Sequence, residues 1–379
     1  MKLPSGFQCA AGRAGIKQSG KPDVALITAL TPAAWALTVT TNRVKAACVT
    51  RNLEQLHSHH PIRAIIINSG NANCATGAAG ARTNTQLAQL AATRLDVTDN
   101  EVITASTGVI GHQLSLEGIK STLPTLTLSD DCDAAAEAIL TTDLVTKTAG
   151  VNLPNGASIV GFAKGSGMIH PNMATMLAFV MTDAAISQER LRELWREIVN
   201  QSFNQITVDG DTSTNDMAVV LSSGHIDADE DALRRGLLAV CQQLAQKIAR
   251  DGEGANKLIT VNVIGAETDV DARRAAKAIV RSPLVKSAAH GNDPNWGRIL
   301  SAIGQEGVDA DYNALTITVQ GELLFAGKPL EFDAEHVSHK MNHSDLRIDV
   351  DLKHGNGQGQ AWGCDLSAQY VHINADYHT

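Results

Sequence analysis

Aromatic side chains are scarce in this sequence of 379 residues. Only 3% of the residues are Phe, Trp or Tyr, while 44% are hydrophobic, so the core must be built mainly from aliphatic side chains. Few rings are available to stack on bases, and a net charge of −9 leaves no broad basic surface for a phosphate backbone. We therefore expect no nucleic acid partner.

Long hydrophobic runs and paired cysteines are also missing from the sequence. The apolar run Met173–Met181 is about half the length that a membrane-spanning helix needs. The N-terminal stretch is mixed and rich in glycine, without the early apolar segment of a secretion signal. None of the six cysteines forms a CxxC motif, and a chain of this length does not need disulfides. These features predict a cytoplasmic protein without a membrane partner.

The chain length and the alternation of apolar patterns indicate the fold class. At roughly 100–200 residues per domain, the chain suggests about two domains or lobes. Runs typical of strands interleave with segments of helical periodicity. We expect strands at Asp23–Ala29, Arg63–Asn68, Met217–Leu221, Leu258–Ile264, Leu315–Val319 and Leu346–Leu352, and helices at Thr85–Leu95, Asp133–Leu140, Ser187–Gln201 and Asp231–Arg250. This order predicts an α/β protein with mixed sheet and helices layered outside.

The helix expected at Ser187–Gln201 has the clearest pattern. Ser187 is suited to cap its N-terminus. Its apolar residues follow the spacing i, i+3, i+4, i+7, i+8 of one helical stripe, and they are Leu191, Leu194, Trp195, Ile198 and Val199. We expect this stripe to face the core.

The most unusual stretch is Gly161–Val180, which is rich in glycine. It fits neither phosphate-loop pattern, because Lys164 precedes Gly165 and the third glycine of GxGxxG is missing. One interpretation is a turn that leads into a buried apolar segment. The other concerns Ala174–Thr175, since a Thr that becomes the first residue of a chain can use its own α-amine as the base that activates its hydroxyl.

Two further glycine-containing motifs carry groups suited to acyl transfer. In Ser106–Gly111, Thr107 and Gly108 could direct a hydroxyl and a backbone N–H at an oxyanion, although a simple glycine turn is the alternative. In the sequence Asp251–Gly254, Glu253 could bind a substrate amine, and a solvated carboxylate at a helix end is the alternative.

Three clusters could in principle hold a metal or a reactive thiol. Asp209–Asp216 lacks the acidic twelfth position of an EF-hand, so we expect a polar turn before a strand. His336, His339 and His343 share one helical face at i, i+3 and i+7, which we expect to be a surface face. Cys74 has no assigned base and is predicted to be a structural thiol.

A series of motifs along the chain resembles one protein family. It resembles the glutamate N-acetyltransferase / ornithine acetyltransferase family of arginine biosynthesis. The motifs, in order, are TNRV at 41–44, NSGNANCATG at 68–77, STGVIG at 106–111, TTD at 141–143, KGSGMIHPNMATMLAF at 164–179, FNQITVDGDTSTND at 203–216, ARDGEGANKLI at 249–259, SPLVKSAAHGNDPNWGRIL at 282–300 and YVHINADYHT at 370–379. Because the series spans the chain, the resemblance is specific.

The resemblance implies a self-cleaving enzyme. The precursor would cut itself between Ala174 and Thr175, giving an α chain, residues 1–174, and a β chain, residues 175–379. Thr175 would then carry the acetyl group of N-acetyl-L-ornithine to L-glutamate, with ornithine released first. The implied fold is a two-lobed layered sandwich of mixed sheets with outer helices, assembled as an α₂β₂ heterotetramer, with no cofactor and no metal.

The resemblance also assigns site residues by matching motif positions. Thr107 and Gly108 match the oxyanion stabilisers. The matching substrate-binding positions are Thr142, Lys164, Thr175, Glu253, Asn374 and Thr379, with Thr141 as the alternative to Thr142.

Other functions fit parts of the same pattern. Self-cleaving aminopeptidases use Ser as the nucleophile, which the Thr175 context disfavours. An acetyltransferase or amidohydrolase acting on other N-acetyl amino acids is a closer alternative, and an amino-acid-binding protein that stays uncut is the non-enzymatic one. Acetyl-CoA as a second acetyl donor is left open by the sequence.

Overall fold

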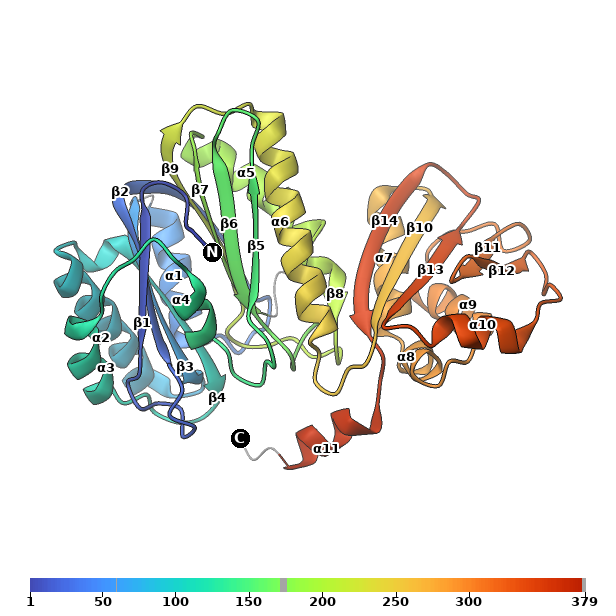
Figure 1. Cartoon of the computed structure of the whole chain (residues 1–379), viewed down its shortest axis with the longest axis horizontal. Coiled ribbons are helices and arrows are strands. Elements are labelled where there is room, and N and C mark those ends of the chain that lie inside the picture. Colours follow the sequence, from blue (N-terminus) through green and yellow to red (C-terminus); the bar gives the residue numbers. More distant parts are fainter. Residues whose placement is uncertain (59, 171–175, 377–379) are drawn as a thin grey trace.

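The chain folds into two lobes of unequal size (Figure 1). The computed structural model describes residues 1–58, 60–170 and 176–376. The first lobe holds an eight-stranded sheet and the second a six-stranded sheet. The two-lobed α/β architecture expected from the sequence is confirmed.

The first sheet gathers strands from a long stretch of the chain. Its order is β4-β3-β2-β9-β7-β6-β5, with β1 paired to β2. The strands are β1 (Phe7–Gly12), β2 (Val24–Val39), β3 (Ile62–Asn71), β4 (Val102–Val109), β5 (Lys147–Asn152), β6 (Ser158–Lys164), β7 (Leu177–Ala184) and β9 (Met217–Ile226). The pairs β3–β4 and β7–β9 are parallel and the other pairs are antiparallel, so the sheet is mixed.

Strand β2 belongs to both halves of this sheet. Its first part pairs with β1 and β3, and its second part, from Ala34 to Val39, pairs with β9. The register with β3 shifts between Thr28 and Ala33, and Leu30 in this stretch is 54% exposed. The strand is therefore longer than the Asp23–Ala29 predicted, because its second half is buried on a separate half-sheet.

Four layers make up the first lobe. One cluster of buried side chains lies between the two half-sheets and includes Ile65 and Ile67 of β3 with Phe162 of β6 and Phe179 of β7. Each half-sheet is covered outside by helices, and each of these layers has its own core. The helices of this lobe are α1 (Ala47–Ser58), α2 (Gly77–Leu95), α3 (Glu117–Thr122), α4 (Asp133–Ala138), α5 (Gln188–Asn200) and α6 (Glu230–Arg250). The layered sandwich of mixed sheets with outer helices is thus present.

Helices α5 and α6 confirm the periodicity argument. The buried residues of α5 are the five predicted for its apolar stripe, and the Ser187 hydroxyl caps it by accepting a hydrogen bond from the Arg190 N–H at 3.3 Å. The apolar face of α6 is likewise buried. Helix α2 starts earlier than predicted, at Gly77 instead of Thr85. Glycines had obscured its first turns, and Gly80 is needed there because a Cβ would lie 1.8 Å from Thr76 Oγ1.

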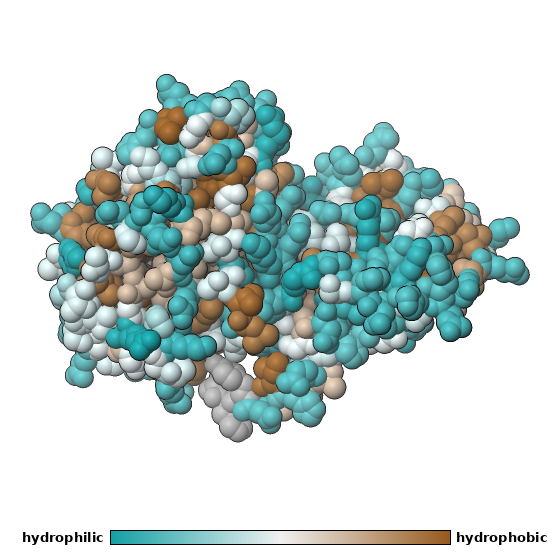
Figure 2. Space-filling model, viewed as in Figure 1, coloured by the Kyte–Doolittle hydropathy of each residue, from teal (hydrophilic) through white to brown (hydrophobic). Residues whose placement is uncertain are grey.

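The second lobe packs helices against its six-stranded sheet. The sheet order is β12-β11-β13-β10-β14-β8. Its strands are β8 (Ile206–Thr207), β10 (Leu258–Ala266), β11 (Thr316–Val319), β12 (Glu322–Ala326), β13 (Asp345–Asp351) and β14 (Gly357–Cys364), and its helices are α7 (Asp269–Arg281), α8 (Pro283–His290), α9 (Trp296–Glu306) and α10 (Ala334–Met341). The face seen in Figure 2 is mostly hydrophilic over this lobe, apart from small hydrophobic groups at its top and its outer end, and further hydrophobic residues lie on the first lobe and where the lobes meet.

The last described helix, α11 (Ala368–Asp376), leaves the second lobe. It follows β14 and crosses back beneath the first lobe (Figure 1). None of its described residues is buried. Helix α11 therefore brings C-terminal residues to the first lobe although it buries none of its described side chains.

The predicted histidine face is only partly helical, and the cysteines are free. Helix α10 ends at Met341, so the predicted helical face of three histidines was wrong for His343, which lies beyond the helix. All three histidines are exposed, as expected. Cys74 is buried, and each of the six cysteines is free. Among the residues that the structure describes, no helix combines the length and apolar character needed to cross a membrane.

Candidate active site

A cavity of about 170 Å³ is lined by residues of the first lobe, by the turn after α6 and by helix α11. Its lining brings together predicted site residues from distant parts of the sequence: Thr107, Gly108, Thr142, Lys164, Glu253 and Asn374. Thr141 lines it too, so either threonine of this pair is available to a ligand. Ala174, Thr175 and Thr379 lie outside the described residues, but Met176, the residue after Thr175, is part of the lining.

The end of β4 supplies Thr107 and Gly108. Gly108 has φ +128°, and a Cβ on it would lie 2.4 Å from the carbonyl carbon of Gly70 on the parallel strand β3. Only glycine fits this close approach. The resulting backbone turns the strand end so that both residues face the cavity.

The hydroxyl of Thr107 has a defined donor on one side. Lys164 Nζ, at the end of β6, donates a hydrogen bond to Thr107 Oγ1 at 3.3 Å. An ammonium group has donors only, so the Thr107 oxygen acts as the acceptor in this contact and its own proton is free to be donated elsewhere. An oxyanion in the cavity could use that proton.

Lys164 is a buried cation. The residue is 8% exposed, and its ammonium lies 3.9 Å from the carboxylate of Asp143. Burial lowers the pKa of Lys164 below its ordinary value, while Asp143 opposes that shift and Lys147 adds to it. The charge state of Lys164 therefore depends on its neighbours.

Glu253 and Asn374 meet on the opposite side of the cavity. Glu253 lies in the turn after α6, where its N–H donates to the Ser166 carbonyl at 3.1 Å. Asn374 of α11 donates from Nδ2 to Glu253 Oε2 at 2.9 Å. Gly167 allows the carboxylate to sit here, because a Cβ on it would lie 2.4 Å from the Glu253 carboxyl group. A carboxylate at this position is suited to bind an ammonium group.

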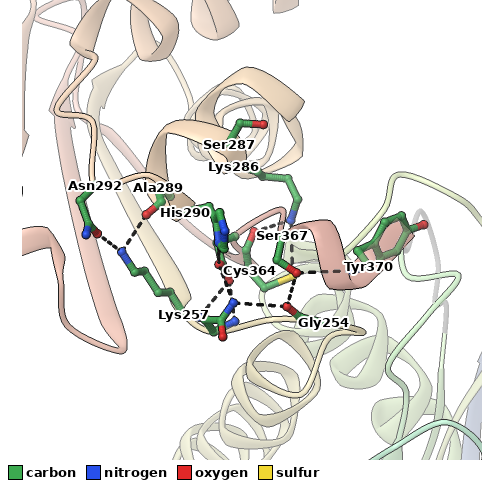
Figure 3. A network of polar contacts seen from close by, with 12 residues as sticks. Gly254, Lys257, Lys286, Ser287, Ala289, His290, Asn292, Cys364, Ser367 and Tyr370 are labelled. Atoms are coloured by element: carbon green, nitrogen blue, oxygen red, sulfur yellow. Dashed lines mark hydrogen bonds and ion pairs between the residues drawn. The ribbon is translucent and has the colours of Figure 1, made fainter. Parts of the chain in front are cut away.

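The start of α11 is attached to the same turn (Figure 3). The Ser367 hydroxyl donates to the Gly254 carbonyl at 2.6 Å and accepts a hydrogen bond from the Tyr370 N–H at 3.4 Å. Gly254 has φ +70°, and a Cβ on it would lie 2.5 Å from the Tyr370 nitrogen. The turn that carries Glu253 and the helix that carries Asn374 thus form one unit.

The model of the ArgJ family matches residues 8–379. The chain belongs to the ArgJ family. This confirms the resemblance drawn from the motifs along the sequence.

Relatives within the ArgJ family cover the whole chain. An arginine biosynthesis bifunctional protein ArgJ from Thermus thermophilus is 52% identical over 380 residues, covering 100% of both chains. The protein of the same name from Deinococcus radiodurans is 50% identical and covers 100% of this chain and 98% of its own. A solved structure named arginine biosynthesis bifunctional protein argJ, from Bacillus halodurans, is 44% identical with a TM-score of 0.52, and it covers 54% of this chain and 100% of its own.

One segment of this ArgJ-family chain lines the cavity although we had not assigned it to the site. The polar turn Asp209–Asp216 contributes its last four residues, Ser213 to Asp216. Asn215 Nδ2 donates to the carbonyls of Ala72 at 2.6 Å and Ser106 at 2.9 Å, which links the segment after β3 to strand β4. The sequence did offer one signal for this segment, because short polar side chains are dense before a buried strand. That pattern predicts a turn, but it does not indicate that the turn faces the cavity.

Asp209 holds this segment in a turn. Its carboxylate accepts hydrogen bonds from the N–H groups of Met168 at 2.6 Å, Ile169 at 2.9 Å and Asp211 at 3.1 Å. These hydrogen bonds fasten the start of the segment to residues 168 and 169 and close its turn. The prediction of a polar turn before a strand is confirmed, since β9 starts at Met217.

Proposed function

We propose that this ArgJ-family protein transfers the acetyl group of N-acetyl-L-ornithine to L-glutamate, giving L-ornithine and N-acetyl-L-glutamate. The observation that carries the proposal is the single cavity in which Thr107, Lys164 and Glu253 converge beside Met176. The names of the relatives, which refer to arginine biosynthesis, support the substrate class. Both amino acids carry an ammonium group and at least one carboxylate, which suits a cavity that offers both a carboxylate and a cation.

Self-cleavage between Ala174 and Thr175 would create the nucleophile. It would divide the precursor into an α chain, residues 1–174, and a β chain, residues 175–379. The Bacillus halodurans chain supports this division, because it is covered completely and yet spans 54% of this chain, the share that 205 of 379 residues would take. A freed Thr175 carries its own base, the α-amine, whose ordinary pKa of about 7.7–8.0 suits proton transfer near neutral pH.

The transfer then proceeds in two balanced steps. In the first, the Thr175 oxygen attacks the acetyl carbonyl of N-acetyl-L-ornithine, its proton passes to the α-amine, and the C–N bond breaks as that proton is delivered to the leaving ornithine nitrogen. In the second, the neutral glutamate amine attacks the acetyl-Thr175 ester, the proton that it loses passes through the Thr175 α-amine to the threonine oxygen, and the acyl C–O bond breaks. In both steps the Thr107 hydroxyl and the Gly108 N–H stabilise the oxyanion.

The remaining residues bind the substrates. Glu253, held by Asn374, binds the ammonium group of the amino acid, and Lys164 faces its carboxylate end. Thr142, with Thr141 beside it, and the terminal Thr379 complete the binding set. The group is transferred as an ester of the chain itself, so the reaction uses neither a cofactor nor a metal.

The proposal includes an assembly and a compartment for the protein. We propose an α₂β₂ heterotetramer of the two cleaved chains, working in the cytoplasm. Two neighbouring apolar side chains near the cavity, Leu144 at 84% exposure and Val145 at 56%, support an assembled form that covers them. The free, buried thiols are what a reducing compartment allows.

A Thr175→Ala variant tests the central claim. We expect the wild-type protein to give two bands on a denaturing gel and to release ornithine from N-acetyl-L-ornithine, with added glutamate accelerating the release. Thr175→Ala should remain one polypeptide of about 40 kDa and be inactive. Thr175→Ser is the matched control and should retain part of both activities. A single uncut species in an active wild-type preparation would contradict the proposal.

A second reaction is favoured by one observation. The relatives are named bifunctional proteins, which supports acetyl-CoA as an additional acetyl donor for glutamate. Purified protein incubated with glutamate and acetyl-CoA, without N-acetyl-L-ornithine, should form N-acetyl-L-glutamate. The absence of that product, with acetyl transfer from N-acetyl-L-ornithine intact, would restrict the protein to the exchange reaction.

A further inference from the structure

Asp143 joins two segments of the cavity lining and was not among the predicted site residues. Its side chain is fully buried. Oδ1 accepts hydrogen bonds from the Gly165 N–H at 2.6 Å and from Lys147 Nζ at 2.7 Å, and Oδ2 accepts one from the Thr141 N–H at 3.1 Å. Oδ2 also lies 3.9 Å from Lys164 Nζ. One carboxylate therefore holds the Thr141–Thr142 loop against the end of β6.

Lys147 extends this connection to a third segment. Its side chain is 0% exposed, and its ammonium donates to Asp143 and, at 2.6 Å, to Asp251 Oδ2. Asp251 accepts a further hydrogen bond from the Leu144 N–H at 3.1 Å, and its carbonyl accepts one from the Ser166 hydroxyl at 2.7 Å. Since Asp251 lies two residues before Glu253, the carboxylate of Glu253 is tied to the same buried cluster.

The cluster is balanced in charge. It contains two carboxylates, Asp143 and Asp251, and two ammonium groups, Lys147 and Lys164. Burial would raise the pKa of Asp143, but Lys164 and Lys147 bring it down to about 2, so this residue is an anion at neutral pH. Removing one member from such a cluster leaves an uncompensated buried charge.

Further charges face Lys164 from other elements. Asp216 and Glu253 favour its protonated form, while Lys147 and Lys17 disfavour it. Asp143 Oδ2 lies within ion-pair distance of Lys164 Nζ, at 3.9 Å, and it comes from the segment before β5, whereas Lys164 ends β6. Asp143 is thus the counter-charge most directly placed to keep Lys164 protonated.

We propose that Asp143 and Lys147 are positioning residues for the acetyl transfer: Asp143 keeps the Lys164 ammonium charged and directed at Thr107, and Lys147 opposes that charge while linking Asp143 to the Glu253 turn. This inference rests on the proposed function. The charge of Lys164 matters because it decides whether the Thr107 hydroxyl can donate its proton to the oxyanion. A charged Lys164 can only donate to Thr107, whereas a neutral amine has a lone pair that would accept the Thr107 proton, and the oxyanion would lose that donor.

Three variants test the charge argument, because the two single variants should move the alkaline limb of the kcat profile in opposite directions. Asp143→Asn leaves an excess positive charge, so the alkaline limb of the kcat profile should move to lower pH by about one unit or more. Lys147→Met leaves an excess negative charge, so the same limb should move to higher pH. The double variant Asp143→Asn/Lys147→Met restores the balance and should return the limb toward the wild-type position.

The controls separate charge from packing. Asp231→Asn changes a carboxylate of α6 whose side chain is 75% exposed, and its profile should match the wild type. Activity that falls equally at every pH, with no movement of the alkaline limb in either single variant, would overturn the proposal. So would a double variant that is worse than both single variants. If Asp143→Asn does not fold, the upward movement in Lys147→Met decides the question alone.

A direct titration makes the outcome independent of turnover. The resonance of Lys164 in protein labelled with ¹³C at the lysine ε-carbons, assigned with Lys164→Arg, should titrate at lower pH in Asp143→Asn and at higher pH in Lys147→Met. Unchanged titration in both would contradict the inference. If the wild-type protein transferred no acetyl group while the two variants still showed these shifts of the Lys164 titration, the proposed function would be contradicted and the charge coupling would stand.

Discussion

Gly108 lies where the backbone of β4 closely approaches β3, and this contact shapes one wall of the cavity. Its φ is +128°, and an added Cβ would lie 2.4 Å from the Gly70 carbonyl carbon, which leaves no room for a side chain. Any larger residue must push the two parallel strands apart. The hydroxyl of Thr107 and the N–H of Gly108 would then move away from the oxyanion.

We expect Gly108→Ala to lose both stability and activity. The strained backbone and the steric overlap should lower the free energy of unfolding by about 2 kcal/mol or more. Displaced oxyanion donors should reduce kcat by about 100-fold. Thermal melting and steady-state kinetics measure the two effects.

Gly156→Ala is the matched control for Gly108→Ala. Gly156 also has a positive φ, +90°, but its added Cβ would meet no atom within 4 Å. The strain of placing an L-residue at positive φ should therefore lower the free energy of unfolding of Gly156→Ala by only about 1 kcal/mol, and its kcat should be unchanged. Equal losses of activity in the two variants would show that the close approach at Gly108 has no special role.

His170 makes stability depend on pH. Burial, reinforced by the charges of Lys277 and Arg281, lowers the pKa of His170 to about 4, and its Nδ1 lies 3.1 Å from Thr207 Oγ1. In the unfolded chain the imidazole takes up a proton near pH 6.5, whereas in the folded protein it does so only near pH 4. The unfolded state thus binds more protons in this window, and stability falls as the pH falls from 6.5 to 4.

A His170→Gln variant should weaken this pH dependence. Glutamine can still hydrogen-bond to Thr207 but does not titrate. After allowance for solvent screening of a half-buried group, the wild type should lose about 1 kcal/mol more than the variant between pH 7 and pH 5. Melting temperatures at the two pH values give the comparison, and an identical drop in both proteins would contradict the assignment.

At the scale of single elements, α11 depends on a few polar contacts. None of its described residues is buried, so its position rests on the bonds from Ser367 to Gly254 and from Asn374 to Glu253. The Ser367 side chain lies at the junction of β14 and α11, where one hydroxyl both donates and accepts (Figure 3). Loss of that hydroxyl should loosen the helix without disturbing the sheet.

We expect Ser367→Ala to raise KM more than it changes kcat. The lost hydrogen bond is worth about 1 kcal/mol, which corresponds to a rise in KM of roughly fivefold for the amino-acid substrates. Ser287→Ala is the matched control, because Ser287 is exposed and donates to the Pro283 carbonyl within its own helix at 2.7 Å. A fall in kcat with unchanged KM would mean that α11 does not hold the binding side of the cavity.

At the scale of the whole molecule, the proposed cleavage point does not coincide with the boundary between lobes. Strands β7 and β9 follow residue 175, yet β7 pairs with β6 and β9 pairs with β2, both of which precede it. The core between the half-sheets also mixes both segments, with Phe162 and Phe179 in one cluster. The two chains would therefore share one sheet and one core.

The cleaved chains should stay together in native buffer. Size-exclusion chromatography should give one species that a denaturing gel resolves into two chains, since separation would expose strand edges and apolar faces. Elution of two separate chains at micromolar concentration without denaturant would contradict this prediction. The uncut Thr175→Ala protein is the reference for the elution volume.

Features that depend on local pattern could be predicted from the amino-acid order alone. The stripe of α5 was predicted residue by residue, because helical periodicity and the Ser187 cap act within a few residues. The ordered motifs determined the family, and with it the candidate residues Thr107, Lys164 and Glu253. Where local pattern was interrupted, as at the glycines of α2 or along the divided strand β2, the element bounds were misjudged.

Which of these residues meet depends on how the chain folds in space. Lys164 and Thr107 are 57 positions apart and Asn374 and Glu253 are 121 apart, and their contacts exist because strand pairing and the path of α11 bring them to one cavity. The buried cluster around Asp143 and Lys147 was invisible for the same reason. A charge is stable inside a protein only when its partners surround it in space, and no pattern along the chain specifies partners that arrive from distant elements.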